Sequence, residues 1–570
     1  MAVENLITEH IDIWTSAVKT KSTSGRGSSK KLELYGVKKL RELILELAVR
    51  GKLVPQDAND EPVATLLKQN HIEQSRLTVE ENLKTKASQS ILDSEEYILV
   101  PETWGRIKLG NLAKFIDYRG KTPKKLSAGV RLITAKNVKF GYLSLQPEEF
   151  ISEAEYKTWM TRGFPRIGDI LFTPEAPLGN VAQVDLEEKF ALAQRAICLQ
   201  FHLSDISNYL RLFLMSPSFQ NLLSEKATGT TAKGIKASVL KELVVYIPPI
   251  EEQHRIVAKV DELMTLCDQL EQQTEASIEA HQVLVTNLLN TLTNSADADE
   301  LMQNWARISE HFDTLFTTEE SIDQLKQTIL QLAVMGKLVP QNPDDEPAAE
   351  LLKRIAEEKA LPPIAEDEKP FELPSGWEWC RGDEIADFID PQPSHRTPPK
   401  VEGGVPYIGY TDIDHNSGID FNNARKVGGN VLEEHRERYT LRVGDFVFGK
   451  IGTLGKPFFL PKPFDYCLSA NLILIQPKNE HVTPKFLALY LNSPTLYQVL
   501  GEQKTNSTHG VFGIKKARLL PIPLPPIQEQ DLIVAKIEEL ETICEQLKMR
   551  LIDSHTTKVE LTDTIVEQAV

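Results

Sequence analysis

Apolar residues recur three and four positions apart along several stretches of the chain, which is the spacing of helices that bury one face. One predicted helix has its apolar positions between Val37 and Ala48 and stops at Gly51. Two longer helices are predicted after Pro249 and after Pro526, where the steps alternate between four and three, the heptad spacing of a coiled coil. The seam residues of the first long helix are Ile256, Val260, Leu263, Cys267 and Leu270, followed by Leu284, Leu288, Leu289 and Leu292; those of the second are Ile533, Ile537, Leu540, Cys544, Leu547 and Leu551.

Each of these seams requires a helical partner. The available partners are the helix that ends at Gly51 and a second predicted helix that ends at Gly336. We therefore expect antiparallel helix pairs, although four separate surface helices would show the same periodicity.

Two other stretches are richer in proline, glycine and aromatic residues and contain short runs of β-favouring residues. In residues 101–249 these runs are 130–134, 170–173, 196–201 and 243–247, with helical segments at 206–215 and 218–226. This mixture predicts an α+β domain, and a second one follows later in the chain. The predicted organisation is an N-terminal helical region at 1–98, an α+β domain at 99–249, a helical spacer at 250–370, a second α+β domain at 371–525 and a spacer helix at 526–570.

The chain contains one unit twice. Residues 46–56 and 331–341 are identical at nine of eleven positions, at an offset of 285. Further matches continue through both α+β domains and into both long helices, which indicates a duplicated set of domains rather than a short-period solenoid. Residues 121–130 resemble nothing near 391–405, so the two domains are expected to bind different things.

The composition is that of an ordinary soluble globular protein, with 41% hydrophobic and 25% charged residues. No run of about eighteen apolar residues is present, and the N-terminus lacks the pattern of a signal peptide. The five cysteines are scattered without a Cys-x-x-Cys pair, which argues against a disulfide framework and against a zinc site. We therefore expect a cytoplasmic protein without membrane contact.

The net charge of −17 is unevenly distributed. Residues 100–250 have a balance of +6, residues 371–526 a balance of 0, and all remaining residues together a balance of −23. The acidic residues are therefore concentrated in the connecting segments, and the α+β domains remain compatible with DNA contact.

Sequence motifs for catalysis are missing. The chain has no G-x-x-x-x-G-K-[ST] motif, no Asn-Pro-Pro-Tyr or Asp-Pro-Pro-Tyr motif of adenine methyltransferases, and no His-Glu-x-x-His motif. Carboxylate pairs such as Glu148–Glu149 are typical of solvated surfaces. We therefore expect a binding protein and not an enzyme.

Two segments of the first α+β domain have residues suited to nucleic acid. Residues 131–139 end a predicted strand at Lys136 and Asn137, and residues 228–236 form a loop of Gly, Thr and Lys with a counterpart at 505–516. Hydroxyl groups, backbone amides and lysines bind phosphates, whereas Asn, Gln and Arg read base edges. Such loops are common in proteins without a ligand, so it is the repetition in both copies that favours a binding role.

The chain contains Leu-Pro-Ser-Gly-Trp-Glu-Trp at 373–379, Gly-Asp-Ile-Leu-Phe at 168–172, Gly-Ile-Lys before each domain end and Pro-Pro-Ile-Glu-Glu-Gln at 248–253. As an ordered set these motifs resemble one family, the specificity subunits of type I restriction–modification systems. The Ala-Val-Arg-Gly-Lys-Leu-Val-Pro-Gln stretch and the long N-terminal extension are similar to the type IB subfamily in particular.

The resemblance implies that each α+β domain is a target recognition domain that reads one half of a bipartite, asymmetric DNA sequence. It implies that the helices form an antiparallel coiled-coil spacer with an internal pseudo-twofold repeat. The implied partners are double-stranded DNA, two modification subunits and two restriction subunits. No cofactor is expected in this chain; S-adenosylmethionine is expected in the modification subunit, which methylates adenine N6, and ATP and Mg in the restriction subunit.

The resemblance also gives candidate DNA-binding residues at the matching motif positions, although each lysine among them can equally be a solvated surface residue. In the first domain these are Lys136, Asn137, Arg195, Thr230, Thr231, Lys233 and Lys236, and in the second Tyr410, Thr411, Lys450, Asn471, Ser507, His509, Lys515 and Lys516. Gly168–Asp169 and Gly444–Asp445 are expected to form structural turns, and Trp104 and Trp377 to pack in the core.

Two other hypotheses stay open on the sequence alone. One is a DNA- or protein-binding coiled-coil scaffold that is not coupled to restriction. The other is a fused modification enzyme, which the missing cofactor motifs oppose.

Overall fold

The computed structural model describes residues 3–21, 31–80, 91–92, 95–118, 123–229, 233–356, 361–394, 396–415, 417–449, 456–478, 481–501 and 513–570. The chain forms two compact units, Met1–Ser277 with Ser554–Val570, and Ile278–Asp553. Each unit contains one α+β domain and one helical bundle.

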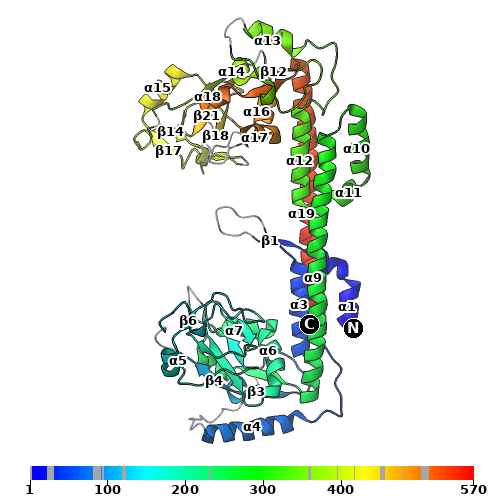
Figure 1. Cartoon of the computed structure of the whole chain (residues 1–570), viewed down its shortest axis with the longest axis vertical. Helices are drawn as coiled ribbons and strands as arrows, with labels where there is room; N and C mark the ends of the chain where they lie inside the picture. Colours follow the sequence, from blue (N-terminus) through cyan, green and yellow to red (C-terminus); the bar gives the residue numbers. More distant parts are fainter. Residues whose placement is uncertain are drawn as a thin grey trace. The chain divides into compact units, whose positions relative to one another are not determined.

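Three helices form the bundle of the first unit: α3 (Tyr35–Val49), the first part of α9 (Ile250–Thr293) and the end of α19 (Ile527–Ala569). Arg41 of α3 pairs with Asp268 and Glu271 of α9 at 2.7 and 2.6 Å. Tyr35 donates a hydrogen bond of 2.7 Å to Asp563 of α19. Lys52, which follows α3, donates to the backbone carbonyl of Val570, so α3 runs in the same direction as the end of α19 (Figure 1).

Short elements surround this bundle. Before α3 the chain forms α1 (Val3–Glu9), α2 (Ile11–Ser16), β1 (Lys19–Lys21) and β2 (Lys31–Glu33), and Trp14 of α2 is fully buried. After α3 it forms α4 (Val63–Glu80), whose Asn70 donates to the carbonyl of Asn111 in the α+β domain at 2.9 Å.

In its described residues the first α+β domain has three small sheets and four α-helices. Its strands are β3 (Gly105–Lys108), β4 (Ala113–Asp117), β5 (Val130–Ile133), β6 (Phe150–Ile151), β7 (Ile170–Phe172), β8 (Val181–Gln183), β9 (Phe190–Leu192), β10 (Ile197–Phe201) and β11 (Val244–Ile247), and its helices are α5 (Glu153–Trp159), α6 (Ser207–Met215), α7 (Pro217–Lys226) and α8 (Ala237–Glu242). The sheet orders are β4-β10-β7-β8, β6-β5-β9 and β11-β3. Among the described strands of this domain only β5 and β9 pair in parallel, and every residue of β7, β9, β10 and β11 is buried.

The second unit has a bundle of the same kind. Its helices are α12 (Glu319–Val334), the end of α9 and the first part of α19, while α10 (Ala298–Glu310) and α11 (Phe312–Leu315) precede α12 and α13 (Ala348–Ala356) follows it and contacts the second α+β domain. Lys326 of α12 pairs with Glu545 of α19 at 2.6 Å, and Lys548 of α19 pairs with Asp323 at 3.1 Å, so these two helices are antiparallel.

The second α+β domain repeats the sheet orders of the first. Its strands are β12 (Glu378–Arg381), β13 (Ala386–Ile389), β14 (Val405–Ile408), β15 (Ile413–Asp414), β16 (Gly418–Ile419), β17 (Arg425–Val427), β18 (Phe446–Gly449), β19 (Phe458–Phe459), β20 (Cys467–Leu468), β21 (Leu472–Pro477) and β22 (Pro521–Leu524), and its helices are α14 (Gly382–Ile385), α15 (Gly429–Arg438), α16 (Pro484–Leu491), α17 (Pro494–Gly501) and α18 (Ile514–Arg518). The sheets β13-β21-β18-β19, β17-β14-β20 and β12-β22 correspond to the three sheets of the first domain, and β15-β16 is an addition.

The repeated Gly-Lys stretch makes the same junction in both units. Gly51 and Gly336 end their helices with φ of +68° and +70°. A Cβ at these positions would lie 2.5 Å from Pro101 and 2.4 Å from Pro374, so only glycine fits. The next residue, Lys337, donates to the carbonyls of Thr293 and Ser295 at the end of α9, as Lys52 does at the end of α19.

A second repeated contact joins each α+β domain to its long helix. Trp104 donates from Nε1 to Glu252 of α9 at 3.1 Å, and Trp377 donates to Glu529 of α19 at 3.0 Å. Both tryptophans are buried, as expected from the sequence. Burial also raises the pKa of both glutamates above the ordinary range, because the ionised carboxylate loses hydration.

The predicted fold class is confirmed: two α+β domains separated by long helices, with one internal repeat. One detail of the predicted helices was wrong. Leu284 is 49% exposed and its neighbour Val285 is buried, so the residues of α9 that face the bundle shift by one position after its polar middle. The predicted antiparallel pairs, α3 with α9 and α12 with α19, are present, and each bundle also includes a third helix, parallel to the short one, that the sequence did not predict.

Candidate nucleic-acid interface

The parallel strands of each α+β domain end at one edge of their sheet. In the first domain Ile133 of β5 lies opposite Leu192 of β9, and the amide of Ala193 donates to the carbonyl of Ile133 at 2.8 Å. In the second domain the amide of Ser469 donates to Ile408 at the same 2.8 Å. The turns that follow these strands are therefore neighbours, and they carry several of the candidate residues.

The turn after the first strand of each pair is closed by its own side chain. Asn137 Oδ1 accepts from the amide of Thr134 at 3.0 Å, and Asp412 Oδ2 accepts from the amide of Gly409 at 2.8 Å. Asn137 and Asp412 are thus equivalent, and so are the residues before them, Lys136 and Thr411. The sequence-based pairing of Lys136 and Asn137 with Tyr410 and Thr411 was wrong by one residue. The sequence alone does not show where the two strands end, and the turns align only when their strand ends are superposed.

Asn137 has a structural role. The residue is fully buried, and its Nδ2 group donates to the carbonyls of Ser144 and Pro147 at 3.0 and 3.2 Å. Its Oδ1 atom also accepts from the hydroxyl of Thr134 at 2.8 Å. The prediction that Asn137 faces DNA was therefore wrong, because its amide is used inside the domain, whereas Lys136 beside it is exposed.

Arg195 lies at the same edge, in the turn after β9. Its side chain is 61% exposed and pairs with Glu175 at 2.8 Å. Glu175 is bridged to Gly234, and the amide of Ile235 donates to Pro174 at 2.9 Å. The structure thus brings Arg195 next to the loop that carries Lys233 and Lys236, both exposed. Thr230 and Thr231 of this loop lie outside the described residues.

In the second domain the corresponding edge is hollowed. Asn471, the counterpart of Arg195, accepts from the hydroxyl of Ser469 and, at 3.4 Å, from the amide of Tyr410. It lines an open pocket of about 490 Å³. The other lining residues are Thr397, Tyr407, Gly409, Thr411, Asp412, Arg425, Ser469 and Ala470. The sequence analysis missed Asp412 and Arg425, although the equal spacing of Asn137 and Asp412 from their strand ends could have identified the first.

The remaining candidates of the second domain are only partly described. Lys515 and Lys516 are exposed on α18, which begins directly after Gly513. Lys450, Ser507 and His509 lie outside the described residues.

The Gly-Asp turns are structural, as the sequence predicted. Asp169 accepts from the amide of Arg166 and from Gln200, each at 2.8 Å, and Asp445 accepts from the amide of Arg442 at 2.7 Å. Burial raises the pKa of both aspartates above its ordinary value. They lie inside their domains and not at the edge described above.

Among the residues that the structure describes, no group of three or more His, Cys, Asp or Glu side chains is arranged to hold a metal ion. None of the helices in this part of the chain is both long and apolar enough to cross a membrane.

Comparisons with known proteins agree with the repeated architecture. A family model described as a type I restriction modification DNA specificity domain matches residues 101–280 and again residues 374–554. The chain is 37% identical to the EcoAI specificity subunit and 36% identical to the EcoEI specificity subunit, both type I restriction enzyme subunits of Escherichia coli, over the whole length of both chains. It is also similar to the HsdS subunit from Thermoanaerobacter tengcongensis, with 19% identity and a TM-score of 0.39 over 84% of this chain and 98% of that one.

Proposed function

This chain belongs to the specificity subunits of type I restriction–modification systems and has two target recognition domains, and from that premise we propose how it reads DNA. Each recognition domain binds one half of a bipartite target through the edge where its two parallel strands end. The observation that carries this proposal is the recurrence of one edge, built from the same turns, in both domains.

The two edges present different side chains. The first domain has Lys136 and Arg195 at the positions where the second has Thr411 and Asn471. Arginine pairs best with guanine and asparagine with adenine in the major groove, so the two half-sites are expected to differ. The target is therefore asymmetric.

The chemistry of modification and restriction belongs to other subunits in this proposal. Modification subunits that bind S-adenosylmethionine methylate adenine N6 after extruding the base, and restriction subunits use ATP and Mg. This chain itself does not catalyse a reaction. It binds the DNA target and positions two copies of each partner subunit on it. The similarity to EcoAI and EcoEI supports an assignment to the type IB subfamily.

Mapping of methylated adenines tests this function. The full chain is produced with its modification subunit, a random DNA library is methylated, and the sites of N6-methyladenine are sequenced. We expect one motif made of two unlike half-sites with a fixed gap. Methylation without a two-part motif, or no effect of this chain on where methylation occurs, would contradict the proposal and favour a scaffold.

The variant Arg195→Asn gives the first domain the side chain of the second at this place. We expect the base preference of one half-site to change by about 1–3 kcal/mol per base pair, while the other half-site and the gap stay the same. Lys189→Ala is a matched control, because Lys189 precedes β9 at the opposite end of the same strand. A change in both half-sites, or in neither, would count against direct reading by Arg195.

A further inference from the structure

The two copies of the eleven-residue repeat differ at two positions only. Glu46 and Arg50 of the first copy are replaced by Gln331 and Met335 in the second. The nine identical positions include the last turn of the helix, the glycine that ends it and the lysine that makes the junction described above. Two changes confined to one turn of helix suggest that these side chains contact something that differs between the two units.

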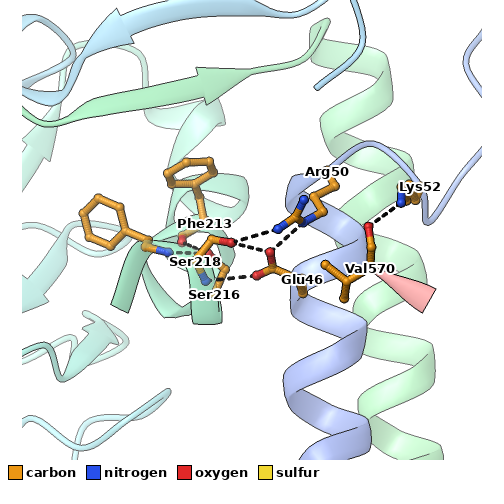
Figure 2. Close-up of polar contacts among 8 residues, drawn as sticks. Glu46, Arg50, Lys52, Phe213, Ser216, Ser218 and Val570 are labelled. Atoms are coloured by element: carbon orange, nitrogen blue, oxygen red, sulfur yellow. Dashed lines mark hydrogen bonds and ion pairs between the residues drawn. The ribbon is translucent and has the colours of Figure 1, made fainter. Parts of the chain in front are cut away.

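In the first unit both residues contact the recognition domain (Figure 2). Glu46, 4% exposed, accepts from the backbone amide of Ser218 at 3.0 Å and from the Ser218 hydroxyl. Arg50 donates from Nε to Glu46 at 2.7 Å and reaches the Ser218 hydroxyl at 3.5 Å. Hydrogen bonds among Glu46, Arg50 and Ser218 thus connect α3 to the start of α7.

The position of Ser218 gives this contact its strength. Ser216 is the N-cap of α7 and accepts from the amide of Phe219, which leaves the amide of Ser218 without a partner inside its helix. The carboxylate of Glu46 satisfies that amide from a different helix. A negative charge at a helix N-terminus is favoured by the helix dipole, and a hydrogen bond to a charged acceptor is stronger than a neutral one.

The second unit has neutral side chains at this junction. Ser493 caps α17 as Ser216 caps α7, and Thr495 takes the place of Ser218. Gln331 and Met335 carry no charge, so neither an ion pair nor a charge-assisted cap can form there. The charged contact between α3 and α7 in the first unit therefore has no charged counterpart at the equivalent position of the second unit.

We propose that Glu46, oriented by Arg50, is a positioning residue that holds the first recognition domain on α3 by capping α7. This inference rests on the proposed function, because a fixed domain on the spacer is what defines a fixed gap between half-sites. The repeat differs from its second copy at Glu46 and Arg50 because these two side chains serve the first domain alone.

Hydrogen exchange at the Ser218 amide tests the contact in the full chain. In Glu46→Gln/Arg50→Met we expect this amide to exchange at least about tenfold faster, the factor for losing one charge-assisted hydrogen bond. Glu46→Arg/Arg50→Glu retains an ion pair within α3 but places a cation at the start of α7, so exchange should accelerate as much. Slow exchange in this reversed variant would overturn the proposal, because an ion pair between positions 46 and 50 would then be enough to protect the Ser218 amide, whichever charge faces α7. Lys39→Glu/Glu42→Lys, which reverses a half-buried i,i+3 ion pair on the same helix, is the control.

The functional test is the gap between half-sites. With the modification subunit present, the wild-type chain is expected to direct methylation to one gap length. Glu46→Gln/Arg50→Met should raise methylation at gaps one base pair longer or shorter by about tenfold, with both half-site sequences unchanged. An unaltered gap profile would overturn this inference alone. Absence of any two-part motif in the wild type would instead overturn the proposed function.

Discussion

Asn137 is fully buried, and its amide group makes four hydrogen bonds that close the turn after β5. Its sequence neighbour Lys136 is exposed at the same edge. Residue type alone suggested DNA contact for both, because asparagine and lysine are common in DNA interfaces. Burial separates them: a side chain whose donors and acceptors are all used inside the domain has none left for a base.

The variants Asn137→Ala and Lys136→Ala should therefore have opposite effects. Removal of the Asn137 amide leaves buried backbone groups without partners, so we expect unfolding free energy to fall by about 2 kcal/mol or more. Lys136→Ala should leave stability within about 0.5 kcal/mol of wild type and weaken DNA binding instead. Urea unfolding and DNA titration of both variants measure this. A stable Asn137→Ala chain with weak DNA binding would restore the original sequence-based interpretation.

At the scale of elements, the repeated framework was predictable because local chemistry dictates it. Gly51 and Gly336 end helices in the left-handed conformation, and Pro-Pro before Ile250 and Ile527 precedes the long helices. The polar middle of α9 was harder, because Thr274 and Ser277 interrupt the seam and the periodicity alone does not fix its register afterwards. Only packing against the other helices shows that Val285, and not Leu284, is buried.

The junction glycines give a test at this scale. Gly51→Ala requires a positive φ in a residue with a Cβ and forces that atom to 2.5 Å from Pro101, so we expect a loss of more than about 1–2 kcal/mol in unfolding free energy. Gly429→Ala is the matched control, because no atom lies within 4 Å of its Cβ and its φ is not in the left-handed region. Chemical denaturation compares the two. Equal stability of both variants would show that the junction relaxes without cost.

At the scale of the whole molecule, the third helix of each bundle could not be predicted from local sequence. The end of α19 joins α3 across more than five hundred residues, through Tyr35 with Asp563 and Lys52 with Val570. Periodicity shows that a helix has an apolar face but not which distant segment covers it. The internal duplication indicated part of this arrangement, because two copies of the Gly-Lys junction imply two helical bundles of the same kind.

Charge is the whole-molecule property that bears most directly on DNA. The first recognition domain, at +6 over residues 100–250, carries the only clear excess of basic residues, whereas the second is balanced and the rest is strongly acidic. A protein that neutralises DNA phosphates releases counterions. For each phosphate contact, the logarithm of its affinity then falls by about 0.9 for every tenfold rise in salt concentration. We therefore expect most of the salt dependence of DNA binding by this chain to arise from the first domain.

Lys233→Ala/Lys236→Ala tests this expectation. If both lysines contact phosphates, the slope of log affinity against log salt should fall by about two, and the loss should be the same for specific and unrelated DNA. Lys157→Ala/Lys189→Ala removes the same charge from two other exposed positions of the first domain, one in α5 and one directly before β9, so its slope should stay close to that of wild type. Equal slopes for the two double variants would mean that net charge, and not contact at the Arg195 edge, governs binding, and the placement of DNA at that edge would have to be abandoned.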